Sequence, residues 1–235
     1  MTFAVAEFAS RPWVQRAIKI PRDPNSVLSF FLGFDVKDVD ASEKLKSGSY
    51  VQDMQPLWFN SNIEFDDLCR NFSPVVREAG KGTLEGQDWL DIKGKVAKLI
   101  LCDQLSRNCF RGTDEAFFYD DTSLTLANDL AESAFKDDED WMPSYTFFVT
   151  LAFMHSENIH DHEVADKLLQ KAMSESWCPF INWNYQSDYL IAHTNVIRKF
   201  GHYPHRNSKK GRQTTPEEQE WLNSDDCPLW AKSQG

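Results

Sequence analysis

The stretch KVAKLILCDQLSRNCF, Lys95 to Phe110, decides the fold because it is apolar over most of a helical surface. On a helix that turns about 100° per residue, Val96, Leu99 and Ile100 share one stripe with Phe110. The neighbouring flank is also apolar and holds Ala97, Leu101 and Leu105. A narrow face is left for solvent, and it is expected to hold Lys95, Lys98, Cys102, Ser106 and Cys109. The pattern predicts a helix that is buried over most of its circumference.

Two charged residues, Asp103 and Arg107, lie in the middle of the apolar stripe. Burying a charge costs several kcal/mol unless the charge is paired or hydrogen-bonded, so neither residue is accidental there. They could pair with each other and lock the packing of the helix. Alternatively, they could form the floor of a pocket together with Gln104, Asn108 and Arg111.

Helix signals continue on both sides of this stretch. Asp23-Pro24 begins a segment that ends at Gly33, and Asn62 begins another that ends at Gly80. Residues 35–53 are polar and are interpreted as a loop or an insertion. Towards the C-terminus, helices are expected over residues 114–135, 144–154, 162–175 and 185–200. Alternation typical of strands is scarce, so the predicted fold class is all-α.

The final helix has its own start signal, because Thr215-Pro216-Glu217-Glu218 supplies an N-cap, a proline at the first helical position and a glutamate at the third. This combination predicts a capping box. The segment from Asp225 to Gly235 is expected to be loose apart from Trp230.

Composition and charge exclude several classes of protein. The chain has 235 residues, of which 41% are hydrophobic and 13% aromatic, which suits one domain with a sizeable core. Its net charge of -11 disfavours binding to nucleic acid or to an anionic membrane. The five cysteines form no CxxC pair and suit a reducing compartment. No membrane-length apolar run or secretory signal is present, so the expected location is the cytoplasm.

The segment from Tyr189 to Pro216 reverses this acidic character. It contains no Asp or Glu and six basic residues, Arg198, Lys199, Arg206, Lys209, Lys210 and Arg212. His205 and Asn207 lie among them. Such a segment attracts anions, although a solvated basic loop is the alternative interpretation.

Two further polar groups lie next to apolar helical faces. His193 is central on the apolar face of the helix expected near 185–200, and His155-Ser156-Glu157 follows the apolar run 147–154. His155 and Glu157 are two residues apart, which is not the i,i+4 geometry of a helical metal motif. No metal site is therefore predicted. His160 and His162 are expected to face solvent.

Known catalytic and nucleotide-binding motifs are missing. The sequence has no GxSxG, no Walker loop and no GxGxxG, so neither acyl transfer nor a nucleotide cofactor is predicted. No cofactor of another kind is expected.

Taken in order, several short motifs resemble the domain of unknown function family 924. The central ones are residues 101–112 (LCDQLSRNCFRG) and 116–120 (AFFYD). The others are Trp58-Phe59, Phe65-Asp66, Phe72, Trp89, His155-Ser156-Glu157, His193, Phe200-Gly201, Pro204-His205-Arg206-Asn207, Gly211-Arg212 and residues 215–218. The order and spacing hold from about Asn25 to Leu222. Two departures are His202, where the family usually has Arg, and a longer segment 35–53.

The resemblance implies a single all-α domain, a tetratricopeptide-repeat-like bundle of antiparallel helices. We expect an N-terminal extension over residues 1–24, the helical domain over 25–224 and a C-terminal tail over 225–235. The family has no generally assigned reaction, so the resemblance implies a fold and no chemistry.

Three functional hypotheses follow. In the first, an internal pocket binds a small anionic metabolite through Gln104, Arg107, Asn108, Arg111, His205, Arg206, Asn207 and Arg212. There His155 and His193, with Glu157 and Asp103 as partners, could perform acid–base catalysis. In the second, the chain is an adaptor or accessory protein whose helical-repeat surface supports another enzyme of a metabolic pathway. In the third, the polar groups form a structural core in which Arg206, Asn207 and Arg212 cap helices and pair with Asp103, Asp120 and Glu157.

Overall fold

The structure is a computed structural model and describes residues 5–232. The ends of the expected N-terminal extension and C-terminal tail, residues 1–4 and 233–235, lie outside the described part. The described residues form helices and no strand, which confirms the all-α class. The tetratricopeptide-like arrangement and the proposed domain limits stay predictions.

The N-terminal helices pack onto the domain core. Helices α1 (Val5–Ser10), α2 (Pro12–Lys19) and α3 (Pro24–Leu32) follow one another closely. The prediction for α3 is confirmed, because the side chain of Asp23 accepts a hydrogen bond from the Ser26 amide and Gly33 ends the helix at φ 80°. Phe8 of α1 packs on Phe30 of α3, so residues before 25 contribute to the same core.

Residues 35–53 are not a loop, and this prediction was wrong. They contain α4 (Ala41–Ser47) and the first residues of α5 (Tyr50–Phe59). Leu45, Tyr50 and Met54 are buried, because apolar residues three to five apart face the core between charged neighbours. Gly48, at φ 71°, makes the tight connection between the two helices.

The helix expected from Asn62 to Gly80 is interrupted. Helix α6 (Ile63–Cys69) is followed by a 3-10 turn (Arg70–Phe72) and then by α7 (Ser73–Gly80). Pro74 explains the break, because it lacks an amide hydrogen and is tolerated only in the first turn of a helix.

The central helix consists of α8 (Ile92–Leu99), a π-helical turn (Ile100–Leu105) and α9 (Ser106–Cys109). From Leu99 to Phe110 it is buried on every side, because α3, α7 and α10 all pack against the central helix. The expected solvent face was therefore wrong for Cys102, Ser106 and Cys109, which are buried. The π-helical turn carries Asp103 and Gln104, and such turns are frequent at functional sites.

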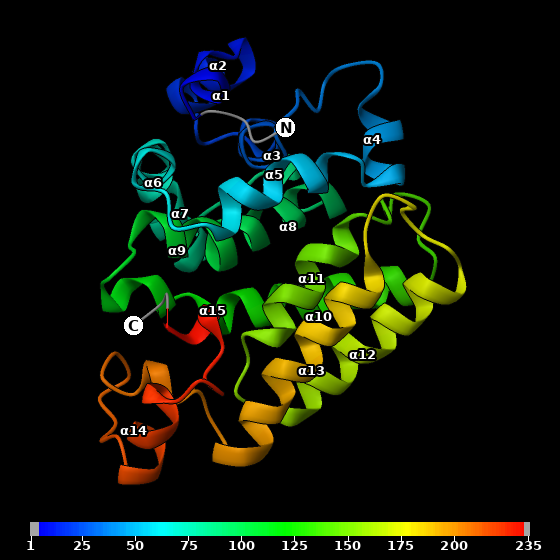
Figure 1. Cartoon of the computed structure of the whole chain (residues 1–235). Helices are drawn as coiled ribbons and strands as arrows, with labels where there is room; N and C mark the ends of the chain where they lie inside the picture. The colour runs from blue at the N-terminus through cyan, green and yellow to red at the C-terminus, as the bar shows by residue number, and fades with distance from the viewer. Residues whose placement is uncertain (1–4, 233–235) are drawn as a thin grey trace.

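The C-terminal half is a layer of consecutive helices, shown in green to orange in Figure 1. A 3-10 turn (Asp114–Phe117) precedes α10 (Asp120–Phe135), so the helix expected from 114 is broken at 118–119. Helices α11 (Tyr145–Met154), α12 (Ile159–Ser174) and α13 (Trp183–Phe200) follow, and α12 packs against both of its neighbours. Figure 1 shows α11, α12 and α13 side by side.

The chain then returns towards the centre of the molecule. It forms a 3-10 turn (Pro204–Arg206), α14 (Pro216–Asn223) and α15 (Leu229–Lys232). The capping box predicted at Thr215 and Glu218 is confirmed. The segment after Asp225 is more ordered than expected, since α15 packs its buried Ala231 against a small cluster with Trp221. No helix among residues 5–232 has the length and apolarity to cross a membrane.

Candidate functional site

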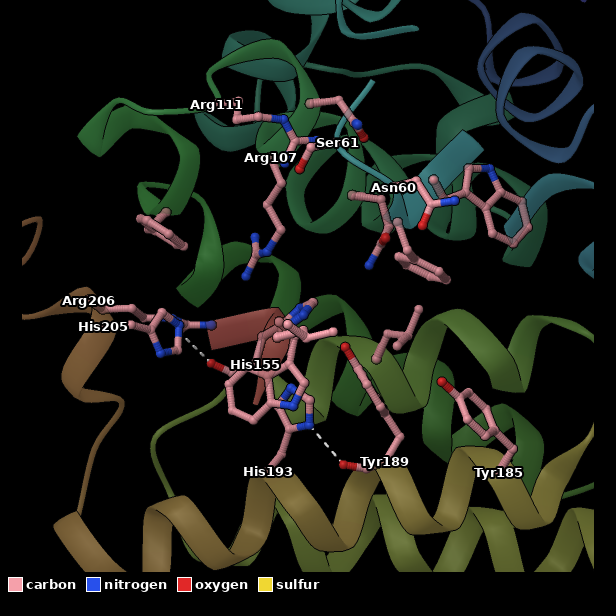
Figure 2. A pocket seen from close by; sticks show the side chains of 18 residues that line it. Asn60, Ser61, Arg107, Arg111, His155, Tyr185, Tyr189, His193, His205 and Arg206 are labelled. Atoms are coloured by element: carbon pink, nitrogen blue, oxygen red, sulfur yellow. Dashed lines mark hydrogen bonds between the residues drawn. The ribbon is translucent and has the colours of Figure 1, made fainter. Parts of the chain in front are cut away.

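A cavity of about 620 Å³ lies where the two halves of the chain meet (Figure 2). Its wall is built from segments far apart in sequence: the end of α5, the central helix, the end of α11, the inner face of α13, the 3-10 turn at Pro204–Arg206, and α15. Figure 2 shows Arg107 and Arg111 on one side of the cavity and Tyr189 and His193 of α13 on the other. Polar residues predicted from separate motifs therefore share one chamber.

The central helix contributes three of the predicted ligand-binding residues to the wall, Gln104, Arg107 and Asn108, and Arg111 follows two residues after its end. The spacing explains the clustering, because residues three or four apart share a helical face. His205 and Arg206 reach the same cavity from the C-terminal 3-10 turn.

Arg107 and Arg206 are joined by one carboxylate. Asp120, at the start of α10, accepts from Arg107 Nη2 at 3.0 Å and from Arg206 Nη1 at 3.3 Å. Arg107 also donates to the carbonyl of Asp103 at 2.9 Å, whereas its Nη2 lies 3.8 Å from the Asp103 carboxylate. The expected Asp103–Arg107 pair is thus weak, and the main partner of Arg107 is Asp120.

A second carboxylate holds Arg111. Asp66 of α6 accepts from Arg111 Nε at 2.6 Å and from Arg111 Nη2 at 3.1 Å, and it also accepts from Asn108 at 2.9 Å. This bidentate geometry fixes the plane of the guanidinium group.

His155 and Asp103 form a dyad at the cavity wall. His155 Nδ1 lies 2.7 Å from Asp103 Oδ1, and Gln104 donates to Asp103 Oδ2 at 2.6 Å. Burial raises the pKa of Asp103, but its interactions with His155, Arg107 and Gln104 outweigh burial and lower that pKa to about 2. An ionised carboxylate only accepts hydrogen bonds, so the proton of the His155 ring is on Nδ1 and Nε2 is left as an acceptor.

The His155 ring itself is neutral at pH 7. Burial lowers its pKa, and the positive charge of Arg107 lowers it further. A neutral imidazole that a carboxylate orients is the arrangement found in general bases. Asp103 does not line the cavity, and it orients the His155 ring through the hydrogen bond to Nδ1.

His193 is held in a similar way by a carbonyl. Its Nδ1 donates to the Tyr189 carbonyl at 2.8 Å, and its ring stacks on Trp230 at 3.8 Å with planes 13° apart. Burial lowers the pKa of His193 well below 6.5, so this ring is also neutral with Nε2 as the acceptor.

His205 and Arg206 carry unpaired polar atoms. Nδ1 of His205 and Nε of Arg206 are buried and have no hydrogen-bond partner among the described residues. Unsatisfied buried groups are uncommon in proteins, so these two atoms lack the partner that such groups usually have. Burial, reinforced by the charge of Arg206, lowers the pKa of His205 to about 3.

The formal charges at the cavity cancel. Three guanidinium groups, from Arg107, Arg111 and Arg206, are matched by three carboxylates, from Asp66, Asp103 and Asp120. The carboxylates support the guanidinium groups, and only the latter line the cavity. In a chain with a net charge of -11, this chamber is neutral and rich in hydrogen-bond donors.

Besides Asp103, three predicted site residues do not line the cavity, namely Glu157, Asn207 and Arg212. Arg212 donates to both oxygens of Glu157, at 2.7 and 2.8 Å, and to the side chain of Asn207 at 2.9 Å. Asn207 donates in turn to Glu218 of the capping box. These residues tie the C-terminal loop to α14 and α11, as the structural-core hypothesis expected of Asn207 and Arg212.

The expected exposure of the two histidines after Glu157 is correct only for His160. His162 is buried, because its ring contacts Thr194 Oγ1 at 3.0 Å and the Ser156 carbonyl at 2.9 Å. It packs α12 against α13 and lies away from the cavity wall.

Sequence reasoning missed several contributors to the site. Asp66 was only part of a motif, and its role as the partner of Arg111 emerges from the fold. Asp120 was named as a partner of the C-terminal arginines, but its hydrogen bond with Arg107 was not expected. Trp230 was expected to be ordered within a loose tail, but its stacking on His193 at the site was not expected. Asn60 and Ser61 line the cavity after α5 and carried no signal in the sequence. Within residues 5–232, no group of three or more His, Cys, Asp or Glu could hold a metal ion.

At pH 7, His155 and His193 are expected to be neutral with the proton on Nδ1. Long-range ¹H–¹⁵N spectra of the imidazole rings measure this directly. The Asp103→Asn variant should change the tautomer of His155 alone, because an amide can donate to Nδ1 and a carboxylate cannot. A wild-type His155 with its proton on Nε2 would contradict the dyad.

Comparison with known proteins agrees with this architecture. The model of a family described as "Bacterial protein of unknown function (DUF924)" matches residues 38–226. A solved structure of a protein of unknown function from Agrobacterium tumefaciens is similar, with 26% sequence identity and a TM-score of 0.57. The match covers 71% of this chain and 88% of that one. No curated protein matches. The chain therefore belongs to the DUF924 family of bacterial proteins.

Proposed function

We propose that this protein binds a small organic anion in the central cavity and that His155 exchanges a proton with the bound molecule. The observation that carries the proposal is the convergence of Arg107, Arg206 and the His155–Asp103 dyad on one chamber of about 620 Å³. Ligand sites for small molecules have volumes in this range, and polar groups that converge on such a cavity fix the orientation of the ligand.

The guanidinium groups of Arg107 and Arg206 would bind the anionic group. Both are held by Asp120, so their orientation is fixed before a ligand arrives. The unpaired Nε of Arg206 is a donor that a carboxylate or phosphate oxygen could satisfy.

His155 would supply the acid–base group. Asp103 holds the proton of the His155 ring on Nδ1, so Nε2 is free to accept a proton from the ligand. An anion entering this neutral chamber would raise the pKa of His155, since a nearby negative charge favours the imidazolium form. Binding and protonation are therefore coupled. The five cysteines are free and buried, which fits the cytoplasmic setting proposed for this role.

Calorimetry with inorganic phosphate, in buffers of different ionisation enthalpy, tests the proposal. Near pH 7 we expect binding to be accompanied by uptake of up to about one proton. The His155→Gln variant should still bind phosphate but take up almost no proton. The matched control is His160→Gln, because His160 is exposed on α12 and distant from the cavity wall.

Two results would refute the proposal. One is the absence of phosphate binding by the wild-type protein. The other is an unchanged proton uptake in His155→Gln, since the proton would then go to another group.

A further inference from the structure

A second cavity of about 280 Å³ adjoins the central chamber between α5 and α13. The two share part of their walls, Phe59, Asn60, Leu151, Tyr185 and Tyr189. The two cavities are therefore adjacent, and the same side chains border both of them.

The second cavity contains an unpaired donor. Gln186 of α13 is only 3% exposed, and its Nε2 is buried with no hydrogen-bond partner among residues 5–232. Gln186 lines the second cavity and does not line the central chamber. An amide buried without a partner costs free energy, so such a group indicates a partner that the protein alone does not provide.

The rest of the wall suits a flat apolar group. Tyr185 and Tyr189 stack with ring centroids 6.3 Å apart and planes 23° apart. Phe59 and Tyr185 are 47% and 58% exposed, although large aromatic side chains are usually mostly buried. Aromatic rings that border a cavity favour planar ligand groups, which pack on their faces or edges.

We infer that the second cavity is a subsite for the distal part of the ligand, a planar apolar group bearing a hydrogen-bond acceptor for Gln186. The inference rests on the proposed function, which assigns the anionic end of the same molecule to Arg107 and Arg206. The ligand class is thus an elongated aryl or similar planar compound, anionic at one end and with a carbonyl or ether oxygen at the other.

The test compares the affinity of inorganic phosphate with that of 4-acetylphenyl phosphate, measured by calorimetry. Burial of the ring predicts at least about tenfold tighter binding of the aryl compound. In Gln186→Leu, the affinity for the aryl compound should fall by about three- to tenfold through loss of the hydrogen bond. The affinity for inorganic phosphate serves as the reference and should change much less. Gln170→Leu, an exposed glutamine on α12, is the control and should change neither affinity.

A second variant, Tyr185→Ala, tests the subsite independently in case Gln186→Leu does not fold. Tyr185→Ala changes an exposed residue and should reduce the advantage of the aryl compound over phosphate. Equal affinities for the two compounds in the wild-type protein would overturn this inference alone. Equal weakening of both compounds by Gln186→Leu would overturn it as well. If neither compound binds, the proposed function itself fails.

Discussion

Lowering the pH from 7 to 5 is expected to reduce the free energy of unfolding by at least about 4 kcal/mol, because the buried rings of His193 and His205 stay neutral in the folded protein. Burial lowers the pKa of His193 well below 6.5 and that of His205 to about 3. The unfolded chain binds a proton at each site near its usual pKa of 6.5. It therefore holds more protons than the folded chain below that pH, and stability falls as the pH falls.

Urea unfolding at a series of pH values measures this effect. Between pH 6 and 5 the slope should approach about 2.7 kcal/mol per pH unit if two protons are involved. The variant His205→Gln should lower the slope by up to about 1.4 kcal/mol per pH unit, because one fewer histidine then stays neutral in the folded protein. The slope that remains comes from His193 and from His155 and His162, whose pKa values burial also lowers. The exposed histidine His160 supplies the control, and His160→Gln should leave the slope unchanged. A flat profile between pH 7 and 5 would show that the two rings are protonated in the folded state.

The substitution Asp120→Ala is expected to lower the free energy of unfolding by about 3–5 kcal/mol, since it leaves two buried guanidinium groups without their carboxylate. The side chains of Arg107 and Arg206 are 9% and 4% exposed, so water cannot replace the lost partner. Chemical denaturation followed by tryptophan fluorescence measures the change.

Asp121→Ala is the matched control for Asp120→Ala. Asp121 is the next residue in the first turn of α10, and its side chain is exposed to solvent. Both aspartates interact with the helix dipole, which contributes about 0.3–1 kcal/mol. The difference between the two variants therefore isolates the ion pairs with Arg107 and Arg206. Equal losses in the two variants would mean that these pairs contribute nothing.

The helical class could be predicted because it depends on local periodicity. The apolar stripe through Val96, Leu99 and Ile100 and the cap at Asp23 are both local signals, and both are present in the structure. Helix α5 was missed because polar residues such as Gln52 and Asp53 lie between its buried ones. The extent of burial around Cys102 was also missed, since which helices surround it depends on the tertiary structure.

The candidate site was predictable only in part, for a related reason. Sequence reasoning identified polar groups on apolar faces, and His155, His193 and Arg107 all reach the cavity. It could not distinguish these cavity residues from Arg212, which does not line the cavity. Arg212 pairs instead with Glu157, a residue 55 positions earlier in the chain. The basic segment had been expected to attract an anion through its own charge. Arg206 pairs with Asp120, 86 residues earlier in the chain, which is a pairing that the structural-core hypothesis had offered.

The carboxylate that Arg107 and Arg206 share also constrains how the sequence can evolve. A mutation that removes the carboxylate of residue 120 leaves two buried guanidinium groups without their ion-pair partner. A mutation that removes one arginine leaves the carboxylate paired with the other arginine alone. Substitutions at residues 107, 120 and 206 should therefore depend on one another, with effects that do not add. Among relatives these three positions are expected to change together or not at all, whatever molecule each relative binds.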